Sequence, residues 1–226
     1  MTYGDQPFTQ TVTGAATEVT YTSSDPAVAT VDAKTGKVTI VGAGTATITA
    51  TAAETADYTT AQASYTLTVN KRRIPVPTEG TNRLVYNGEE QTYLPVIEEA
   101  YKTYCEITGN KATNVYAGGS YTAQVRLNNS NVEWADGTVE AKAYPFQITP
   151  APATVKVLDK QITAGEPAPA LSDADYTVTG LCGGDTLSVA LYYADPADLS
   201  TAVTPDTSKA GTYAIVAGLG ATRDPN

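Results

Sequence analysis

The residue types that carry most enzyme chemistry are scarce in this sequence of 226 residues. It contains no histidine, which rules out the Ser-His-Asp triad, the Cys-His pair and every metal site that uses imidazole. Its two cysteines, Cys105 and Cys182, are far apart in the chain, and we expect two free thiols rather than a disulfide. The sequence indicates no catalytic residue and no cofactor, so we expect that the chain is not an enzyme.

Two groups of aspartates are candidates for a metal site. Asp173–Asp175 and Asp195–Asp198 each bring two carboxylates close together in sequence, and Ca²⁺ prefers carboxylate and carbonyl oxygens. Neither group follows the EF-hand spacing, and the 24 acidic residues of the chain make such pairs common by chance. We therefore expect solvated loops here and no metal.

Aromatic residues are the main candidates for ligand binding. Trp134 is the single tryptophan, and Trp is enriched at binding hot spots. It lies where a strand should enter a turn, so we expect it to anchor the core or a loop rather than to form a ligand platform, because buried aromatic side chains supply much of a small core. For the 15 tyrosines we also expect structural use, with a carbohydrate-stacking face as the alternative. We assign no ligand-binding residue.

Charge and hydropathy limit the partners of this segment. The net charge of −10 argues against the basic surface that nucleic acids require. No stretch approaches the ~20 apolar residues of a membrane span, so we expect no membrane insertion in this segment. A Lys–Asn isopeptide bond would need a lysine, an asparagine and an acidic residue close together inside a domain, and no such trio is marked in the sequence. The bond stays an open alternative, which an intact mass lower by one ammonia would reveal.

The elements that position these residues are predicted to be strands. The 38 threonines and 20 valines, against 11 leucines, favour β-structure because β-branched side chains fit a pleated surface. Tyr65–Val69 and Tyr144–Ile148 alternate apolar and polar residues, as half-buried strands do. Only Val96–Tyr104 could form a helical turn or two.

The chain also repeats itself. The two strands just named start 79 residues apart (144 minus 65), and each is followed by a short polar or proline-bearing link, which reads as a domain boundary. A glycine turn followed by an alternating strand occurs three times, at Ala43–Ile48, Gly118–Ala123 and Ala210–Ile215. These markers predict three domains with the boundaries 1–73, 74–150 and 151–226.

The same spacing predicts where strands are missing. Only Met1–Tyr3 precede the first opening glycine, and Gly211 lies too close to residue 226 for a closing strand to follow at the spacing of the first two domains. We expect that the first domain lacks its opening strand and the third its closing strand. An open edge next to Tyr213–Val216 would then allow strand pairing with another chain, although we expect a monomer in solution.

Several motifs resemble known families. Val19–Asp32, Thr35–Val38 and Gly42–Ile48 resemble the group 2 bacterial Ig-like domain. Tyr86–Thr92 with Trp134–Gly137 is similar to related Ig-like repeats, and Pro167–Leu171 with Tyr176–Leu181 resembles the MBG-type repeats. The resemblance implies tandem Ig-like β-sandwiches arranged end to end, an all-β fold class, in an extracellular or cell-surface protein of a bacterium.

What the resemblance implies for function is a non-catalytic stalk or spacer and adhesion segment. Two alternatives remain open. One is a module that binds a glycan or a host protein through loops at one end, so that the partner is an unknown extracellular protein or glycan. The other is a set of accessory domains of a secreted glycosidase, whose catalytic domain would lie elsewhere in the parent protein.

Overall fold

The structure is a computed structural model, and it describes residues 1–15 and 17–219. These residues form short β-strands and two 3-10 helices, which confirms the predicted all-β class. The chain divides into two compact units, described separately below. Unit 1 contains Met1–Thr81, Leu94–Asn110 and Thr122–Tyr144, and unit 2 contains Asn82–Tyr93, Lys111–Tyr121 and Pro145–Asn226.

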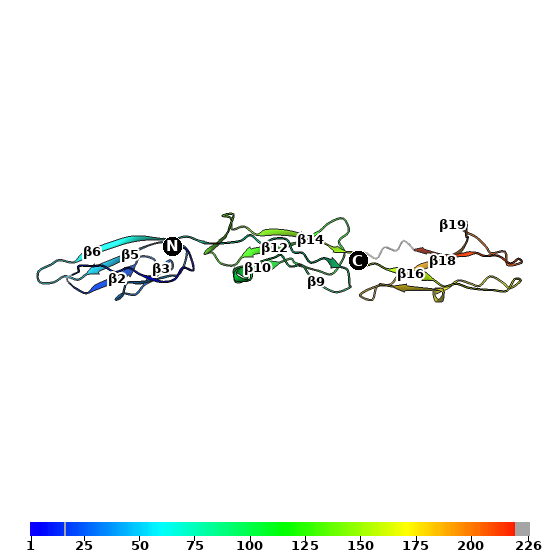
Figure 1. Cartoon of the computed structure of the whole chain (residues 1–226), viewed down its shortest axis with the longest axis horizontal. Coiled ribbons are helices and arrows are strands. Elements are labelled where there is room, and N and C mark those ends of the chain that lie inside the picture. The colour runs from blue at the N-terminus through cyan, green and yellow to red at the C-terminus, as the bar shows by residue number, and fades with distance from the viewer. Residues whose placement is uncertain (16, 220–226) are drawn as a thin grey trace. The chain divides into compact units, whose positions relative to one another are not determined.

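The first part of unit 1 consists of two three-stranded sheets, with the orders β2-β5-β6 and β1-β4-β3 (Figure 1). The central strand β5 is antiparallel to β2 and to β6, and all nine of its residues are paired with β6. The strands are β1 (Phe8–Thr9), β2 (Val19–Ser23), β3 (Ala29–Val31), β4 (Lys37–Ile40), β5 (Gly44–Ala52) and β6 (Ala61–Val69).

The core between these two sheets follows the alternation of the strands. Val28 and Val38 from one side pack against Ile48, Leu67 and Val69 from the other. The threonines between the buried residues of β5 point to the opposite face, because successive side chains alternate across a strand. The predicted inward face of Tyr65–Val69 is therefore confirmed.

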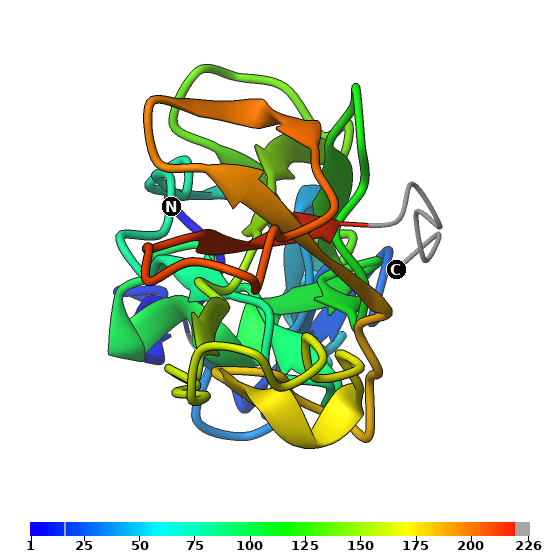
Figure 2. The same ribbon diagram turned by 90° about the vertical axis from the view of Figure 1, so that its right-hand side faces the viewer.

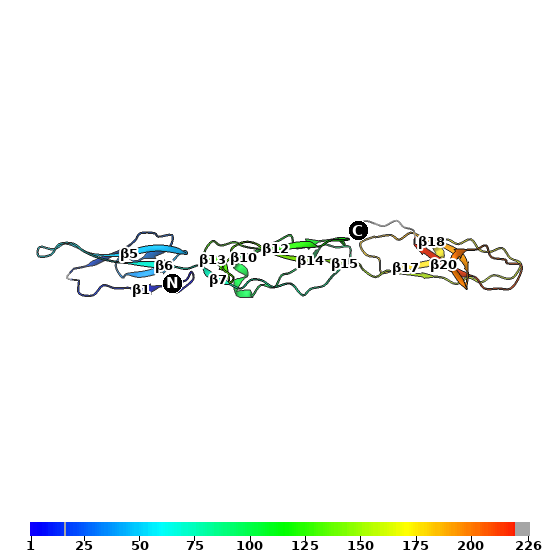
Figure 3. The same cartoon turned by 90° about the horizontal axis from the view of Figure 1, so that it is seen from above.

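The second part of unit 1 is built around a sheet of order β10-β12-β14, in which β12 lies beside β14 (Figure 3). A separate parallel pair joins β7 to β13. The predicted helical turn is the 3-10 helix η1 (Glu99–Tyr104). The strands are β7 (Arg72–Ile74), β10 (Cys105–Thr108), β12 (Tyr121–Leu127), β13 (Val132–Trp134) and β14 (Lys142–Phe146). The first residue of β12, Tyr121, and the last two of β14, Pro145 and Phe146, are counted in unit 2.

Unit 2 begins with two small pairs of strands. β9 (Gln91–Thr92) is antiparallel to β11 (Lys111–Ala112), and β8 (Leu84–Val85) is parallel to β15 (Ile148–Thr149). The Tyr93 ring stacks on the Phe146 ring with 4.9 Å between centroids and 2° between planes. This aromatic stacking adds packing between segments whose two-residue strands form few backbone hydrogen bonds.

The rest of unit 2 contains a strand pair and a three-stranded sheet of order β19-β18-β20. Figure 2 draws the pair β16–β17 in yellow and the three-stranded sheet in orange and red. β16 approaches β20, although the two strands belong to different sheets. The buried apolar residues of this part are Val189 and Ala194 among those described. The elements are β16 (Thr154–Val157), η2 (Asp173–Asp175), β17 (Tyr176–Thr179), β18 (Val189–Asp195), β19 (Asp198–Ala202) and β20 (Ala214–Leu219).

Parallel contacts join early and late segments in both units. In unit 1, Thr2 forms a parallel bridge with Asn70. Tyr3 N–H donates to Asn70 O and Asn70 N–H donates to Met1 O, both at 2.9 Å. In unit 2, β8 and β15 pair in the same sense. The opening and closing segments therefore run side by side and in the same direction.

Candidate functional site

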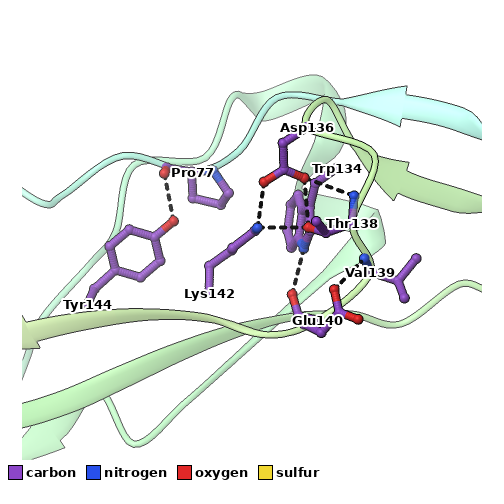
Figure 4. A network of polar contacts seen from close by, with 8 residues as sticks. All are labelled: Pro77, Trp134, Asp136, Thr138, Val139, Glu140, Lys142 and Tyr144. Atoms are coloured by element: carbon purple, nitrogen blue, oxygen red, sulfur yellow. Dashed lines mark hydrogen bonds and ion pairs between the residues drawn. The ribbon is translucent and has the colours of Figure 1, made fainter.

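Trp134 is fully buried and acts as a core anchor, as expected. Its strand β13 pairs with β7, so that Trp134 lies opposite Ile74, which is also buried. The indole Nε1–H donates a hydrogen bond of 2.8 Å to the carbonyl oxygen of Glu140 (Figure 4). The indole thus has no face free for a ligand, and its one polar atom is satisfied inside the protein.

The turn that follows Trp134 contains an ion pair. Lys142 Nζ lies 2.6 Å from Asp136 Oδ2 and donates a hydrogen bond of 2.8 Å to Thr138 Oγ1. Asp136 Oδ1 accepts from the backbone N–H and the hydroxyl of Thr138, at 2.9 and 2.6 Å. The Asp136 carboxylate, the Thr138 hydroxyl and backbone N–H, and the Lys142 ammonium lie together at this turn in Figure 4. The carboxylate thus bridges the turn through Thr138, and Lys142 is ion-paired with that carboxylate.

The electrostatics of this pair favour two charged partners. Mainly the hydrogen bond from Lys142, and then those from Thr138, lower the pKa of Asp136 from 3.8 to about 2. The arrangement therefore supports an ion pair between Lys142 and Asp136.

The Tyr144 hydroxyl makes a second contact in the same region. It donates a hydrogen bond of 2.6 Å to the carbonyl oxygen of Pro77, and both atoms are buried. Pro77 belongs to the extended segment after β7, so this bond ties that segment to β14 (Figure 4). The residues around Trp134 therefore form a structural network.

The Asp173–Asp175 group caps a turn. Asp175 is buried, and its Oδ2 accepts from the backbone N–H and the hydroxyl of Ser172 at 2.8 and 3.1 Å. Lys160 Nζ lies 2.8 Å from Asp175 Oδ1, and chiefly this contact lowers the carboxyl pKa. The carboxylate is fully used by the protein, so the solvated loop expected here is wrong for Asp175.

The Asp195–Asp198 group also serves its own turn. Asp195 Oδ1 accepts from Ala197 N–H at 2.8 Å, and Asp198 Oδ1 accepts from the backbone N–H and hydroxyl of Ser200 at 3.0 and 2.6 Å. In residues 1–15 and 17–219 no three His, Cys, Asp or Glu side chains gather as metal ligands would.

Both cysteines are free and partly buried. Cys105 lies on β10, and its burial raises the pKa of the thiol. A raised pKa leaves less thiolate at neutral pH, so this thiol has little nucleophilic character.

The contact that sequence reasoning missed is a junction centred on Asn131 in unit 1. Its side-chain Oδ1 accepts from the backbone N–H of Ala43 at 2.9 Å, and its carbonyl oxygen accepts from Arg72 N–H at 3.0 Å. Asn129 Oδ1 in turn accepts from Asn131 N–H at 2.9 Å. The signal in the sequence is the asparagine-rich run Asn128–Asn131, whose short amide side chains favour local backbone contacts.

Two family models match the chain. Residues 6–54 match the immunoglobulin-like domain of intimin, and residues 153–226 match the MBG domain of the YGX type. Each match covers less than half of the sequence, and together they are consistent with tandem bacterial Ig-like domains of a surface protein. No curated protein matches the chain.

Solved structures of the surface-layer protein SbsC are similar to the chain. Its domains 1–6 are 16% identical over 91% of this chain and 30% of that one, with a TM-score of 0.26. Its domains 4 and 5 are 18% identical over 63% of this chain and 79% of that one, with a TM-score of 0.24. The chain thus spans less than a third of the longer SbsC structure.

Among the described residues, no helix has the length and apolar character of a membrane span.

Proposed function

We propose that this chain is a non-catalytic stalk or spacer and adhesion segment of a bacterial cell-surface or secreted protein. The matches to the intimin Ig-like and MBG domains support an extracellular surface setting. The sequence contains no histidine, the side chain used most often for general acid–base catalysis.

The observation that carries the spacer role is the junction at Asn131. A spacer has to hold consecutive modules in a fixed relation, and a flexible link would not do so. Here the link between β6 and β7 is short, β7 pairs with β13, and Asn131 ties the loop before β13 to the turn before β5. Side-chain and backbone hydrogen bonds therefore fix the two parts of unit 1 to each other.

The spacer role is tested by measuring the width of the distance distribution between the two parts of unit 1. Spin labels on exposed strand residues, introduced as Thr66→Cys and Glu106→Cys in a Cys105→Ser, Cys182→Ser background, report one distance across unit 1. We expect a narrow distance distribution that widens in Asn131→Ala, because Ala43 N–H loses its acceptor.

The matched control is Asn128→Ala. Asn128 precedes the same loop, but its amide donates to Thr103 O at 3.1 Å instead of contacting the first part of the unit. This variant should keep the narrow distribution. A broad distribution in the unmodified background, or equal widths in both variants, would contradict the spacer role.

A further inference from the structure

The loop between β8 and β9 contains Asn87–Gly88, the only asparagine in the sequence that is followed by glycine. Asn87 is exposed and belongs to no strand. Gly88 has a φ of +79°, a conformation that glycine adopts readily, and it carries no Cβ beside its backbone nitrogen. The side-chain amide of Asn87 and the backbone N–H of Gly88 are therefore adjacent, with no side chain on Gly88 to shield them.

The amide of Asn87 is held in one orientation by its own loop. Its Oδ1 accepts a hydrogen bond of 2.9 Å from the backbone N–H of Glu89, which is the contact of an Asx-turn. A donor at this oxygen stabilises the negative charge that develops on it when a nucleophile attacks Cγ. The loop thus activates the amide carbon of Asn87.

The nucleophile next to this carbon is the backbone nitrogen of Gly88. Among the described residues, its N–H donates to no protein atom, so no hydrogen bond has to break before it reacts. Attack of this nitrogen on Asn87 Cγ closes a five-membered ring. The reaction is therefore intramolecular, and both partners are already held close together by the chain.

We propose that Asn87–Gly88 is a self-modification site, at which Asn87 is converted to a mixture of aspartate and isoaspartate. A bond forms between the Gly88 nitrogen and Asn87 Cγ, and the bond between Cγ and Nδ2 breaks. The Gly88 N–H proton leaves with that amide group as ammonia. Water then opens the succinimide ring, at Cγ to give aspartate or at the backbone carbonyl carbon to give isoaspartate. No group is oxidised or reduced, and water is the co-reactant.

The modified residue lies beside a tight backbone contact inside unit 2. A Cβ on Gly88 would overlap the backbone of Gly183, and a Cβ on Gly183 would lie 2.8 Å from Gly88 Cα. Isoaspartate carries the main chain through the side chain, which lengthens it by one methylene group immediately before Gly88. Because the two glycine backbones leave no space for added atoms, we expect isoaspartate to displace residue 88 from residue 183.

The two products differ in what they change. Both add a negative charge next to Glu89 and Glu90, and Lys111 is already ion-paired with Glu90 at 2.8 Å. Aspartate changes the charge alone, whereas isoaspartate changes the charge and the length of the main chain. The effect of the charge can therefore be separated from the effect of the added methylene group.

Modification is tested by incubating the full chain in neutral buffer and analysing its peptides by mass spectrometry at intervals. We expect Asn87 to gain the mass of an NH2-to-OH exchange at least tenfold faster than Asn82, which is exposed in the same unit but is followed by Arg83. Fragmentation spectra should show both aspartate and isoaspartate at position 87. Equal rates at the two asparagines, or aspartate alone, would contradict the proposed route.

The contribution of the fold is tested with a peptide of residues 83–92, RLVYNGEEQT. Because the loop holds the amide of Asn87, we expect the folded chain to react at least as fast as this peptide. A folded chain that stays unmodified while the peptide reacts would refute the proposal. Asn87→Gln is the matched control, since its amide is kept but attack would have to close a six-membered ring, and position 87 should stay unmodified.

The effect on the contact with Gly183 is measured by hydrogen exchange of peptides that contain residues 180–185. We expect faster exchange after incubation of the unmodified sequence, and no change with time in Asn87→Gln. Asn87→Asp has the added charge with an ordinary main chain, so it should exchange like the fresh chain. If Asn87→Asp reproduced the effect of incubation, the inference about the lengthened main chain would be wrong. The proposal does not depend on the spacer role, because the spin-label distances report unit 1 and these experiments report unit 2.

Discussion

At the scale of single residues, Trp134 is the largest fully buried side chain among the described residues. Its side chain is fully buried and its indole N–H is hydrogen-bonded. We expect Trp134→Ala to destabilise unit 1 by about 3–5 kcal/mol, because a large cavity forms and Glu140 O loses its donor. Urea unfolding followed by circular dichroism measures this loss.

The control for Trp134 is Tyr58→Ala, since Tyr58 is 67% exposed. This change should alter stability by no more than ~0.5 kcal/mol. A small effect of Trp134→Ala would mean that the indole is not part of the core.

Asp136 makes the stability of the turn depend on pH. Its pKa in the folded chain is about 2, below the ordinary value of 3.8, so the ionised carboxyl favours the folded state. That contribution is fully present above the ordinary value and is lost as the pH falls through about 2. We expect Asp136→Asn to lower the melting temperature at neutral pH and to match the unmodified chain near pH 2.

Melting curves across this pH range test the assignment. Asp57→Asn is the control, because Asp57 is exposed and its side chain has no described contact. A melting-temperature difference for Asp136→Asn that stays constant down to the lowest pH would contradict the role of its ionised form.

The burial of a residue could be predicted from the sequence where its own type and its immediate neighbours determine it. Trp134 was predictable as a core residue because a lone tryptophan at a strand end is best buried. The partner of Asn131 was not, because Ala43 lies 88 residues away in the chain and only the folded chain brings them together.

At the scale of elements, the strand predicted at Tyr144–Ile148 divides between two sheets. β14 lies in the sheet with β12, whereas β15 pairs with β8. Between them, the Gln147 amide donates to Gly119 O at 3.0 Å. The alternation of Tyr144, Phe146 and Ile148 was visible in the sequence, but the change of partner depends on non-local pairing.

Two glycines with positive φ angles offer a matched test of backbone contact. At Gly88, a Cβ would overlap the backbone of Gly183, whereas at Gly165 it would meet no heavy atom within 4 Å. Gly165→Ala should therefore cost only the left-handed backbone conformation, about 1–2 kcal/mol, and Gly88→Ala should cost more because backbone atoms must move.

Hydrogen exchange of peptides from β17 and β18 reports this difference, because both strands belong to unit 2. Faster exchange in Gly88→Ala than in Gly165→Ala is the expected result. Equal exchange in the two variants would argue against a tight contact between residues 88 and 183.

At the scale of the whole molecule, composition and periodicity were enough to predict the all-β class, because threonine and valine alternate with small residues along many short runs. The division into 1–73, 74–150 and 151–226 stays a prediction. The proposed strand edge near Tyr213–Val216 corresponds to β20, which has one partner, β18, among the described residues.

The parallel bridge between Thr2 and Asn70 has a consequence for a protein that is pulled. When two parallel strands are drawn apart from opposite ends, they slide along each other, and all their hydrogen bonds are loaded in shear at once. An antiparallel pair opened from one end would break its bonds one after another. We expect Asn70→Pro, which removes the donor to Met1 O, to lower the unfolding force of the first part of unit 1 in single-molecule stretching. Asn70→Ala keeps the backbone N–H and should leave that force unchanged. Forced unfolding follows the unfolding rate, so this contact should contribute to the tension that the first part of unit 1 withstands.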